Sequence, residues 1–292
     1  MKFTQSCLYT ALSVAFAHNA FAGQESDTMT VWSSPASAAT TTVLGQQTMQ
    51  DLDKQNVAQA LSVIPGVALQ KSGNRNEQQV KVRGFDSRQV PIFFDGVPVY
   101  IPYDGNLDLG RFLTSDIASV EVSKGYSSLL QGPNQMGGAI NITTKKPTKP
   151  LEGSIGYRQG WSRSKDNAHD MHASFGASNE LGYLQVSGSQ LKQDFLGLPH
   201  GVDNAIAGSN GKMINSSADD KRGIVKLGFT PRENDEYTLT YINQDGEKDN
   251  PPYAGTSSQK SRYWQWPQYD KESYYYQGTT HLGDRFTLKS RL

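Results

Sequence analysis

The stretch Val90-Pro91-Ile92-Phe93-Phe94-Asp95-Gly96-Val97-Pro98-Val99-Tyr100 decides the fold of the first half of this chain. Two apolar runs, Val90–Phe94 and Val97–Tyr100, flank the dipeptide Asp95-Gly96. Both central positions of a type I′ turn need a positive φ, which Asp and Gly adopt more readily than most residues. The stretch therefore predicts a β-hairpin with a two-residue turn.

The segment around this hairpin, residues 40–147, mixes helix and strand signals. Apolar residues at 3.6-residue spacing predict a helix over Asp53–Ile64, which Pro65-Gly66 ends. About 100 residues with short connections are enough for a separate hydrophobic core. Five further strands are expected, at Thr41–Val43, Val67–Gln70, Gln79–Arg83, Ala118–Lys124 and Ala139–Thr144.

The pattern changes after Lys145–Pro150, a run of prolines and lysines without an apolar face. Apolar and polar residues then alternate in segments of about ten residues, which places them on opposite faces of a sheet. In one such segment Tyr237, Leu239 and Tyr241 share a face. The strands expected from this pattern are Leu151–Gly160, Asp170–Ala177, Gly182–Leu191, Gly223–Thr230, Glu236–Asn243, Ser273–Leu282 and Arg285–Lys289.

The connections between these segments alternate in length. Asn179-Glu180 and Asp284 are expected to be tight turns, whereas Lys192–Arg222 and Gln244–Glu272 are long and polar. Short turns at one end and long loops at the other are typical of barrels in the bacterial outer membrane. A soluble β-sandwich also alternates in this way and remains an alternative.

The first 22 residues predict a secretory signal peptide. Lys2 precedes an apolar run, and Ala20-Phe21-Ala22 ends in the small residues that a signal peptidase requires. Cleavage would remove Cys7, the only cysteine, and would leave 27 basic and 28 acidic residues (28 basic minus Lys2). A net charge near zero argues against a nucleic-acid partner. No later stretch has the 18 consecutive apolar residues of a transmembrane helix.

Five motifs in order resemble the amino-terminal part of TonB-dependent receptors, which import scarce nutrients across the bacterial outer membrane. They are Asp27–Val31, similar to the TonB box, then Val82–Phe85, Phe94–Pro98, Ile117–Val122 and Gly137–Pro147. The chain departs from the family pattern at Ser123-Lys124-Gly125-Tyr126 and at Leu130-Gln131-Gly132.

The resemblance implies an α+β plug domain followed by antiparallel transmembrane β-barrel strands. The expected division is a signal peptide at 1–22, a flexible arm with the TonB box at 23–39, the plug domain at 40–147 and the amino-terminal part of a barrel at 151–292. The family's barrel has 22 strands, and this chain offers about 6–7. We therefore expect a fragment or the product of a disrupted gene, in the cell outer membrane.

The resemblance implies two groups of residues: one that couples the receptor to TonB and one that forms the motifs of the plug. An extended arm made of Asp27, Thr28, Met29, Thr30 and Val31 can add as a strand to a sheet edge of periplasmic TonB. Arg83 can pair with Glu121 or with acids of the barrel wall, or can simply be a solvated surface arginine. The glycines of the plug motifs serve turns or close backbone approach. The plug-motif residues are Arg83, Gly84, Asp95, Gly96, Glu121, Gly137 and Gly138.

Substrate contacts are expected at the outward loops of the plug. Arg88, Tyr100 and Tyr103 could grip an anionic, oxygen-rich metal chelate by charge and ring stacking, or could have no ligand role. The residues Tyr274–Tyr276 are interpreted as part of an aromatic girdle at the membrane interface. Trp264 and Trp266 fit either the girdle or a loop that contacts substrate.

The predicted function is TonB-dependent uptake of a small-molecule metal chelate, most often a ferric siderophore in this family. Haem and cobalamin remain alternative cargoes, and a soluble periplasmic β-rich binding protein remains an alternative class. A receptor with a signalling domain is disfavoured because only Gly23–Ser26 precede the TonB box. No enzyme motif, resident metal or cofactor is expected; His169 and His172 would lie on opposite faces of a strand.

Overall fold

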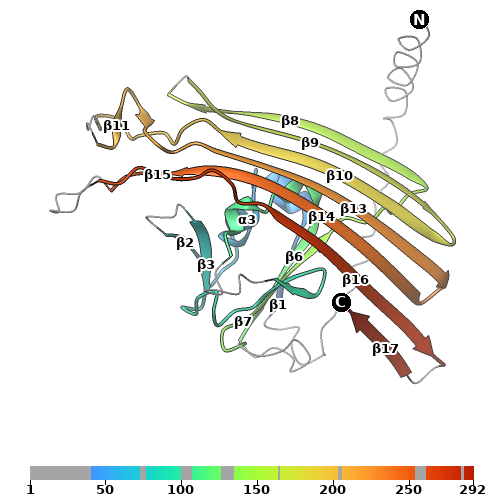
Figure 1. Ribbon diagram of the computed structural model, residues 1–292. Coiled ribbons are helices and arrows are strands. Elements are labelled where there is room, and N and C mark those ends of the chain that lie inside the picture. The colour runs from blue at the N-terminus through green and yellow to red at the C-terminus, as the bar shows by residue number, and fades with distance from the viewer. Residues whose placement is uncertain are drawn as a thin grey trace, which may run out of the picture. The chain divides into compact units, whose positions relative to one another are not determined.

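The computed structural model describes residues 41–72, 77–99, 107–125, 135–163, 165–202, 206–253, 261–283 and 286–292. These residues belong to one compact unit, Pro35–Leu292, built mainly from a five-stranded and an eight-stranded sheet (Figure 1). We call them the central sheet and the wall sheet. The signal peptide and TonB box expected before residue 40, together with Tyr100 and Tyr103, lie outside the described residues.

The central sheet has the strand order β1-β6-β7-β4-β5. It confirms the predicted hairpin, because β4 and β5 pair antiparallel and Asp95 and Gly96 both have positive φ, 50° and 78°. Strand β4 also pairs parallel with β7, so the hairpin lies at one side of the sheet. The strands are β1 (Thr41–Gly45), β4 (Ile92–Phe94), β5 (Val97–Val99), β6 (Ile117–Lys124) and β7 (Gly138–Thr144).

The helix predicted over Asp53–Ile64 is shorter than expected, and α3 spans only Val57–Leu61. Its start is fixed by Asn56, whose side-chain oxygen accepts a hydrogen bond from the Gln59 amide at 2.9 Å. Asp53 has a φ of 50°, which turns the chain before the helix can begin. A second helix, α2 (Gln46–Asp51), escaped prediction because it buries a single residue, Met49. None of the described helices is long and apolar enough to cross a membrane.

The remaining elements of this half are a separate hairpin and two short 3₁₀ helices. Strands β2 (Val67–Ser72) and β3 (Glu77–Val82) pair with each other. The 3₁₀ helices η3 (Leu109–Arg111) and η4 (Thr114–Asp116) precede β6. The core of this half collects buried apolar side chains from most of its elements, among them Met49, Leu61, Val82, Phe94, Leu109, Ile117, Val120, Val122, Ile140 and Ile142.

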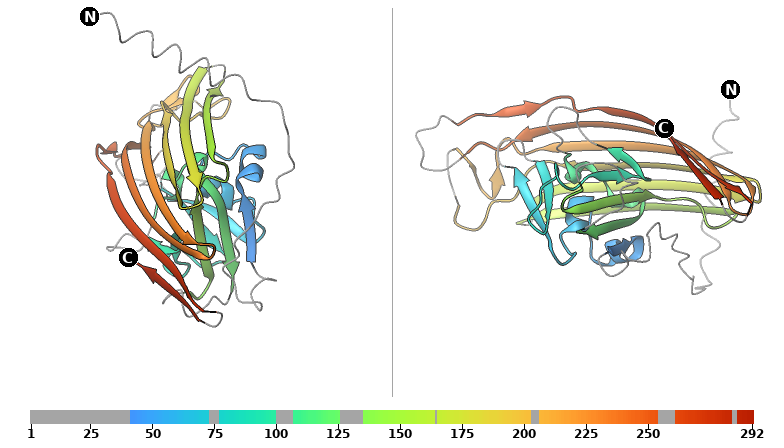
Figure 2. Two further views of the ribbon diagram at one scale, coloured as in Figure 1. Left: turned by 90° about the vertical axis from the view of Figure 1, so that its right-hand side faces the viewer. Right: turned by 90° about the horizontal axis from the view of Figure 1, so that it is seen from below.

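The wall sheet has the order β17-β16-β14-β13-β10-β9-β8, with β15 attached to β14. All its pairs are antiparallel, and the long strands run side by side (Figure 2). Seven consecutive strands confirm the number expected from the alternation. They are β8 (Leu151–Ser162), β9 (Lys165–Asn179), β10 (Gly182–Gln193), β13 (Ala218–Arg232), β14 (Asp235–Asn250), β16 (Lys271–Leu282) and β17 (Phe286–Arg291).

Several wall strands are longer than the sequence predicts, because their polar ends keep pairing where the alternation fades. Strand β14, for example, continues to Asn250 rather than Asn243. The two long connections also contain short strands: β11 (Gly208–Ser209) and β12 (Lys212–Met213) in the first, and β15 (Trp264–Trp266) in the second. The Asn215 side-chain amide ties the two connections together by donating to the carbonyls of Asn250 (2.7 Å) and Trp264 (2.8 Å).

The two faces of the wall sheet differ in chemistry. The inner face packs on the central sheet, since Ile224 and Ile242 belong to the same core as the buried residues of that sheet. The outer face is apolar and exposed; Ile155 is 89% exposed and Phe229 53%. The strand register aligns one outer row across six strands: Gly153, Phe175, Val186, Val225, Tyr241 and Tyr274.

Candidate functional site at the contact between the two sheets

The Asp95 carboxylate joins the predicted hairpin turn to the wall sheet. It accepts hydrogen bonds from the Thr144 amide (2.8 Å) and the Thr144 hydroxyl (2.6 Å), which tie the turn to the end of β7. It also forms an ion pair with Lys226 of β13, whose Nζ lies 2.9 Å from Asp95 Oδ2. Both side chains are 7% exposed. Asp95 therefore serves the turn, the central sheet and the wall at once.

Asp116, the last residue of η4, forms the second contact with the wall. It pairs with Arg222 of β13, which also donates to the Leu113 carbonyl at 2.7 Å. The side chains of Arg222 and Asp116 are only 1% and 3% exposed. A guanidinium with its fixed fork of donors can bind a carboxylate and a carbonyl together. This pair fixes the start of β6 against the wall.

Two further ion pairs surround the 3₁₀ helix η3. Asp108 caps that helix by accepting from the Gly110 amide (3.1 Å), and its second oxygen accepts from Lys248 Nζ of β14 at 2.8 Å. Arg111 at the end of η3 pairs with Asp220 of β13, Nε to Oδ1, at 2.5 Å. The Arg111 guanidinium also lies 4.0 Å above the ring of Tyr269.

Together these four contacts form an ionic seam, defined by the pairs Asp95–Lys226, Asp116–Arg222, Asp108–Lys248 and Arg111–Asp220. In three of the four, the acid comes from the central half and the cation from the wall. Removing charges from water costs several kcal/mol per ion, which a well-bonded partner offsets only approximately. We interpret the seam as a device that fixes the register between the sheets more than as a source of net stability.

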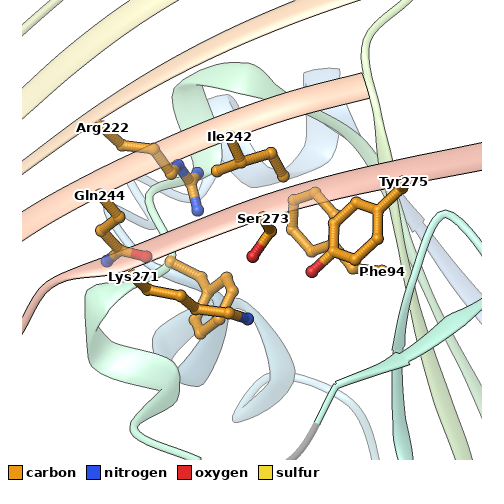
Figure 3. Close-up of a pocket in the computed structure, with 8 residues that line it drawn as sticks. Phe94, Arg222, Ile242, Gln244, Lys271, Ser273 and Tyr275 are labelled. Carbon is orange, nitrogen blue, oxygen red and sulfur yellow. The ribbon is translucent and has the colours of Figure 1, made fainter. Parts of the chain in front are cut away.

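A small cavity lies beside the seam, where side chains of β4, β13, β14 and β16 meet (Figure 3). Phe94 and Phe112 come from the central half, and the other lining residues come from the inner face of the wall. Tyr275 lies against Phe94 in a tilted arrangement, with ring centroids 6.4 Å apart. The wall residues that line the cavity are Arg222, Ile242, Gln244, Lys271, Ser273 and Tyr275.

Among the described residues Arg83 makes no carboxylate pair, which agrees with the alternative of a solvated surface arginine. It has a φ of 50° and forms, with Gly84 (φ 90°), a tight turn closed by hydrogen bonds between Val82 and Phe85. Its guanidinium donates to the Lys124 carbonyl at 3.3 Å and is solvent-exposed. The turn thus places the Arg83 side chain at the end of β6. The ion pairs with the wall are made instead by Arg222, Lys226 and Lys248 of the wall strands.

Gly137 and Gly138 mark a close approach of chain segments at the start of β7. A Cβ on Gly138 would collide with the Ser123 carbonyl oxygen, and the residue has a φ of 119°. A Cβ on Gly137 would collide with the side chains of Phe85 and Val90. Both positions therefore require glycine for space, and Gly138 requires it for backbone conformation as well.

Glu121 lies on β6 between the buried positions Val120 and Val122, and none of the ion pairs found among the described residues includes it. Partial burial raises the pKa of its carboxyl above the usual value. Lys145, just after β7, has a pKa below the usual value. Burial lowers it, and the nearby carboxylates of Asp116 and Glu152 offset only part of that effect.

The candidate substrate residue Arg88 sits in a turn that Asp86 organises. The Asp86 carboxylate accepts from the Arg88 amide at 3.0 Å, and the Arg88 side chain is exposed. Its predicted partners Tyr100 and Tyr103 are outside the described residues, so the grouping of the three stays a prediction.

The aromatic residues of β16 do not act as one girdle. Tyr274 and Tyr276 point outward and are 65% and 36% exposed, whereas Tyr275 points inward to the cavity. Period-two alternation forces this division, so the interpretation of all three as girdle residues is wrong for Tyr275. Trp264 is exposed on β15, with the Arg262 guanidinium 5.6 Å from its ring, and Trp266 packs edge-on against Tyr269 at 5.9 Å.

Sequence reasoning missed most of the ionic seam. Arg222, Lys226 and Lys248 lie on the inner side of alternating strands, where a charged residue among buried neighbours is itself a signal for a partner. Their acids Asp108 and Asp116 sit in short 3₁₀ helices that have no strong sequence pattern. Which acid meets which cation depends on the docking of the two sheets.

Comparison with known families identifies part of this arrangement. Residues 35–139 match the family model described as TonB-dependent Receptor Plug Domain. A vitamin B12 transporter, BtuB of Vibrio vulnificus (strain CMCP6), is 27% identical over 172 residues, which are 57% of this chain and 28% of the relative.

Solved structures share the fold at lower identity. The copper transporter OprC superposes with a TM-score of 0.63 at 20% identity, covering 86% of this chain and 36% of its own. The ferric yersiniabactin uptake receptor FyuA of Yersinia pestis gives 0.62 at 21% identity, with 83% and 38% covered. This chain thus spans little more than a third of these proteins. The relatives named here are transporters and receptors, not enzymes.

Proposed function

We propose that this chain, which belongs to the TonB-dependent receptor family, forms the arm, plug and first wall strands of a receptor for an anionic metal chelate. Its location is the outer membrane. In this proposal residues 1–22 are an export signal, 23–39 the arm, 40–147 the plug and 151–292 the first part of the barrel. The favoured cargo is a ferric siderophore; haem, cobalamin and other chelates are the alternatives.

The main support for an anionic cargo is the distribution of charge along the ionic seam. Lys226, Arg222 and Lys248 of the wall are neutralised by acids of the plug. Any movement that withdraws the plug removes those acids, and it also removes Arg111 from Asp220. Three cations and one carboxylate then remain on the inner face of β13 and β14, with a net positive charge. Siderophore complexes present carboxylate, catecholate or hydroxamate oxygens, which such cations attract at close range.

The outer face of the wall supports a membrane receptor over the soluble binding protein. Leu151, Ile155 and Phe175 are 66%, 89% and 47% exposed on that face. A contiguous apolar face of this extent is costly in water but suits contact with lipid. A soluble protein would have to cover it with another element.

Coupling to TonB is assigned to the arm, with Asp27–Val31 adding as a strand to a sheet edge of the partner. Val31→Pro removes one backbone donor from that ladder, whereas Val31→Ile retains it. In the intact receptor we expect Val31→Pro to abolish energised uptake while surface binding of cargo persists. Val31→Ile should behave as wild type.

The test is uptake by cells that carry the intact receptor as their only route for each cargo. Ferric catecholate and hydroxamate siderophores, haem and cobalamin are offered in labelled form, with and without a functional TonB. We expect TonB-dependent uptake of at least one ferric siderophore and none of cobalamin. Uptake of cobalamin alone would refute the cargo, and uptake that persists without TonB would refute the class.

A further inference from the structure

Lys271 is a wall cation that has no carboxylate partner among the residues that the structure describes. It opens β16 and lies in one cross-strand row with Arg222 and Gln244, since Arg222 is opposite Gln244 and Gln244 is opposite Lys271. Adjacent strands are about 4.8 Å apart, so the backbones of the two cations are separated by about 10 Å. Within the described part of the chain no ion pair joins Lys271 to an acid, and the charged group that acts on it is Arg222.

The Arg222 side chain is 1% exposed but only partly satisfied. One terminal nitrogen serves Asp116 and the Leu113 carbonyl. Its Nε and its other terminal nitrogen, Nη1, are buried without a hydrogen-bond partner among the described residues. Buried donors on a charged group are rarely left without an acceptor, because the loss of hydration is not recovered.

The small cavity lies between these two cations. It is lined by Arg222, Lys271 and the Ser273 side chain on the wall, and by the rings of Phe94 and Phe112 on the plug (Figure 3). Its volume is about 10 Å³, room for a single water-sized species. The rings and Ile242 form the apolar part of the lining, and Gln244 and Tyr275 complete it. The small volume excludes a large ion such as sulfate.

Charge counting around the cavity leaves one positive charge. Arg222 is neutralised by Asp116, and Arg111 by Asp220. Lys271, which is partly buried, remains without a carboxylate among the described residues, and a positive charge beside apolar side chains is disfavoured unless it is compensated. A water molecule would satisfy donors but would not compensate the charge, whereas one monovalent anion does both.

We propose that this cavity binds one chloride-sized anion, held by Arg222, Lys271 and the Ser273 hydroxyl. Because Phe94 and Phe112 of the plug close the site, the anion binds only when the plug is docked. It therefore favours the docked state by mass action. The proposal is independent of which cargo the receptor carries.

Two measurements on the intact receptor in detergent test the site. Crystals grown in bromide should show an anomalous peak between Arg222 and Lys271. The midpoint of thermal unfolding should rise with chloride concentration when gluconate, too large for the cavity, keeps the ionic strength constant. A cavity that holds only water in bromide, or a midpoint that is the same in chloride and gluconate, would overturn the proposal.

Lys271→Met removes the uncompensated charge and keeps an unbranched side chain, so we expect the variant to fold. Its unfolding midpoint should no longer depend on chloride, and its bromide peak should disappear. Lys146→Met is the matched control, since Lys146 is 52% exposed and lies near Glu236, away from the cavity. It should keep the full chloride dependence. An equal loss in both variants would show that the effect is general screening rather than binding.

Discussion

Asp95 has a structural role both in the hairpin turn and in the contact between the two sheets. Its backbone takes the positive φ of the turn, and its carboxylate is shared between Thr144 of the central sheet and Lys226 of the wall. Asparagine tolerates the same φ and can still accept hydrogen bonds, but it carries no charge. A change from Asp to Asn therefore isolates the ionic contribution from the turn.

We expect Asp95→Asn to destabilise the intact receptor by about 3 kcal/mol, because Lys226 would be left buried and unpaired. Unfolding by heat or denaturant in detergent measures this. Adding Lys226→Met should recover most of the loss, since the orphaned charge is gone. A double variant as unstable as Asp95→Asn alone would contradict this account.

Three glycines differ in how strongly their surroundings and backbone conformation exclude a side chain. Gly138 combines a φ of 119° with a collision at the Ser123 carbonyl; Gly84 has a φ of 90° in open space; Gly45 has neither constraint. Replacement by Ala should cost at least about 2 kcal/mol at Gly138, about 1 at Gly84 and close to nothing at Gly45. The same unfolding measurement ranks them, and a Gly138 variant as stable as the Gly45 variant would refute the argument.

Strand β6 shows how an element distributes its residues. Val120 and Val122 face the core, and Glu121 between them is partly buried on the other face. An ionised carboxyl there is disfavoured, so the pKa of Glu121 lies above its ordinary value of 4.5. Below that value the carboxyl is protonated in both states and carries no penalty. As the pH rises above 4.5, Glu121 ionises first in the unfolded chain, so the free energy of unfolding decreases.

Glu121→Gln removes this titration. We expect the variant to gain stability relative to wild type as the pH rises from about 4 to about 7, and to match it at the acid end. Comparing unfolding midpoints across that range gives the difference, with Glu180→Gln in an exposed turn as a control that should show no such trend. A constant offset at every pH would mean that packing, not ionisation, separates the two proteins.

At the scale of the whole molecule, the two faces of the wall sheet differ in chemistry because they meet different surroundings. Its outer face presents a row of apolar side chains, whereas its inner face holds the cations of the ionic seam. Along β14 the outer residues change from Leu239 to Asp245, six residues or about 20 Å apart. That distance is enough to pass from the apolar band to its rim.

We expect Leu239→Lys to destabilise the membrane-inserted receptor by about 2–4 kcal/mol, as for a cation at mid-bilayer. Asp245→Lys, on the same face and strand, should cost less than about 1 kcal/mol, because it lies among other charged residues outside the band. Heat-modifiable mobility on gels and the yield in the membrane fraction report the difference. Equal effects at the two positions would argue against lipid contact.

Local structure followed from short-range patterns in the sequence. Asp95-Gly96 specified the turn, and alternation specified seven wall strands, because φ preference and period-two patterning act within a few residues. The sequence was less reliable where a cap competes with periodicity: Asn56 caps α3, which starts at Val57, four residues after the first expected position at Asp53.

The partners of the charged residues, in contrast, depend on how the chain folds as a whole. Arg83 carried the motif but bonds a carbonyl, whereas Arg222 and Lys226 received the carboxylates of Asp116 and Asp95. More than a hundred residues separate each of these pairs along the chain, and nothing in a local pattern relates them. The physical reason is that a buried charge needs a partner, while the identity of that partner depends on how two independently formed sheets dock.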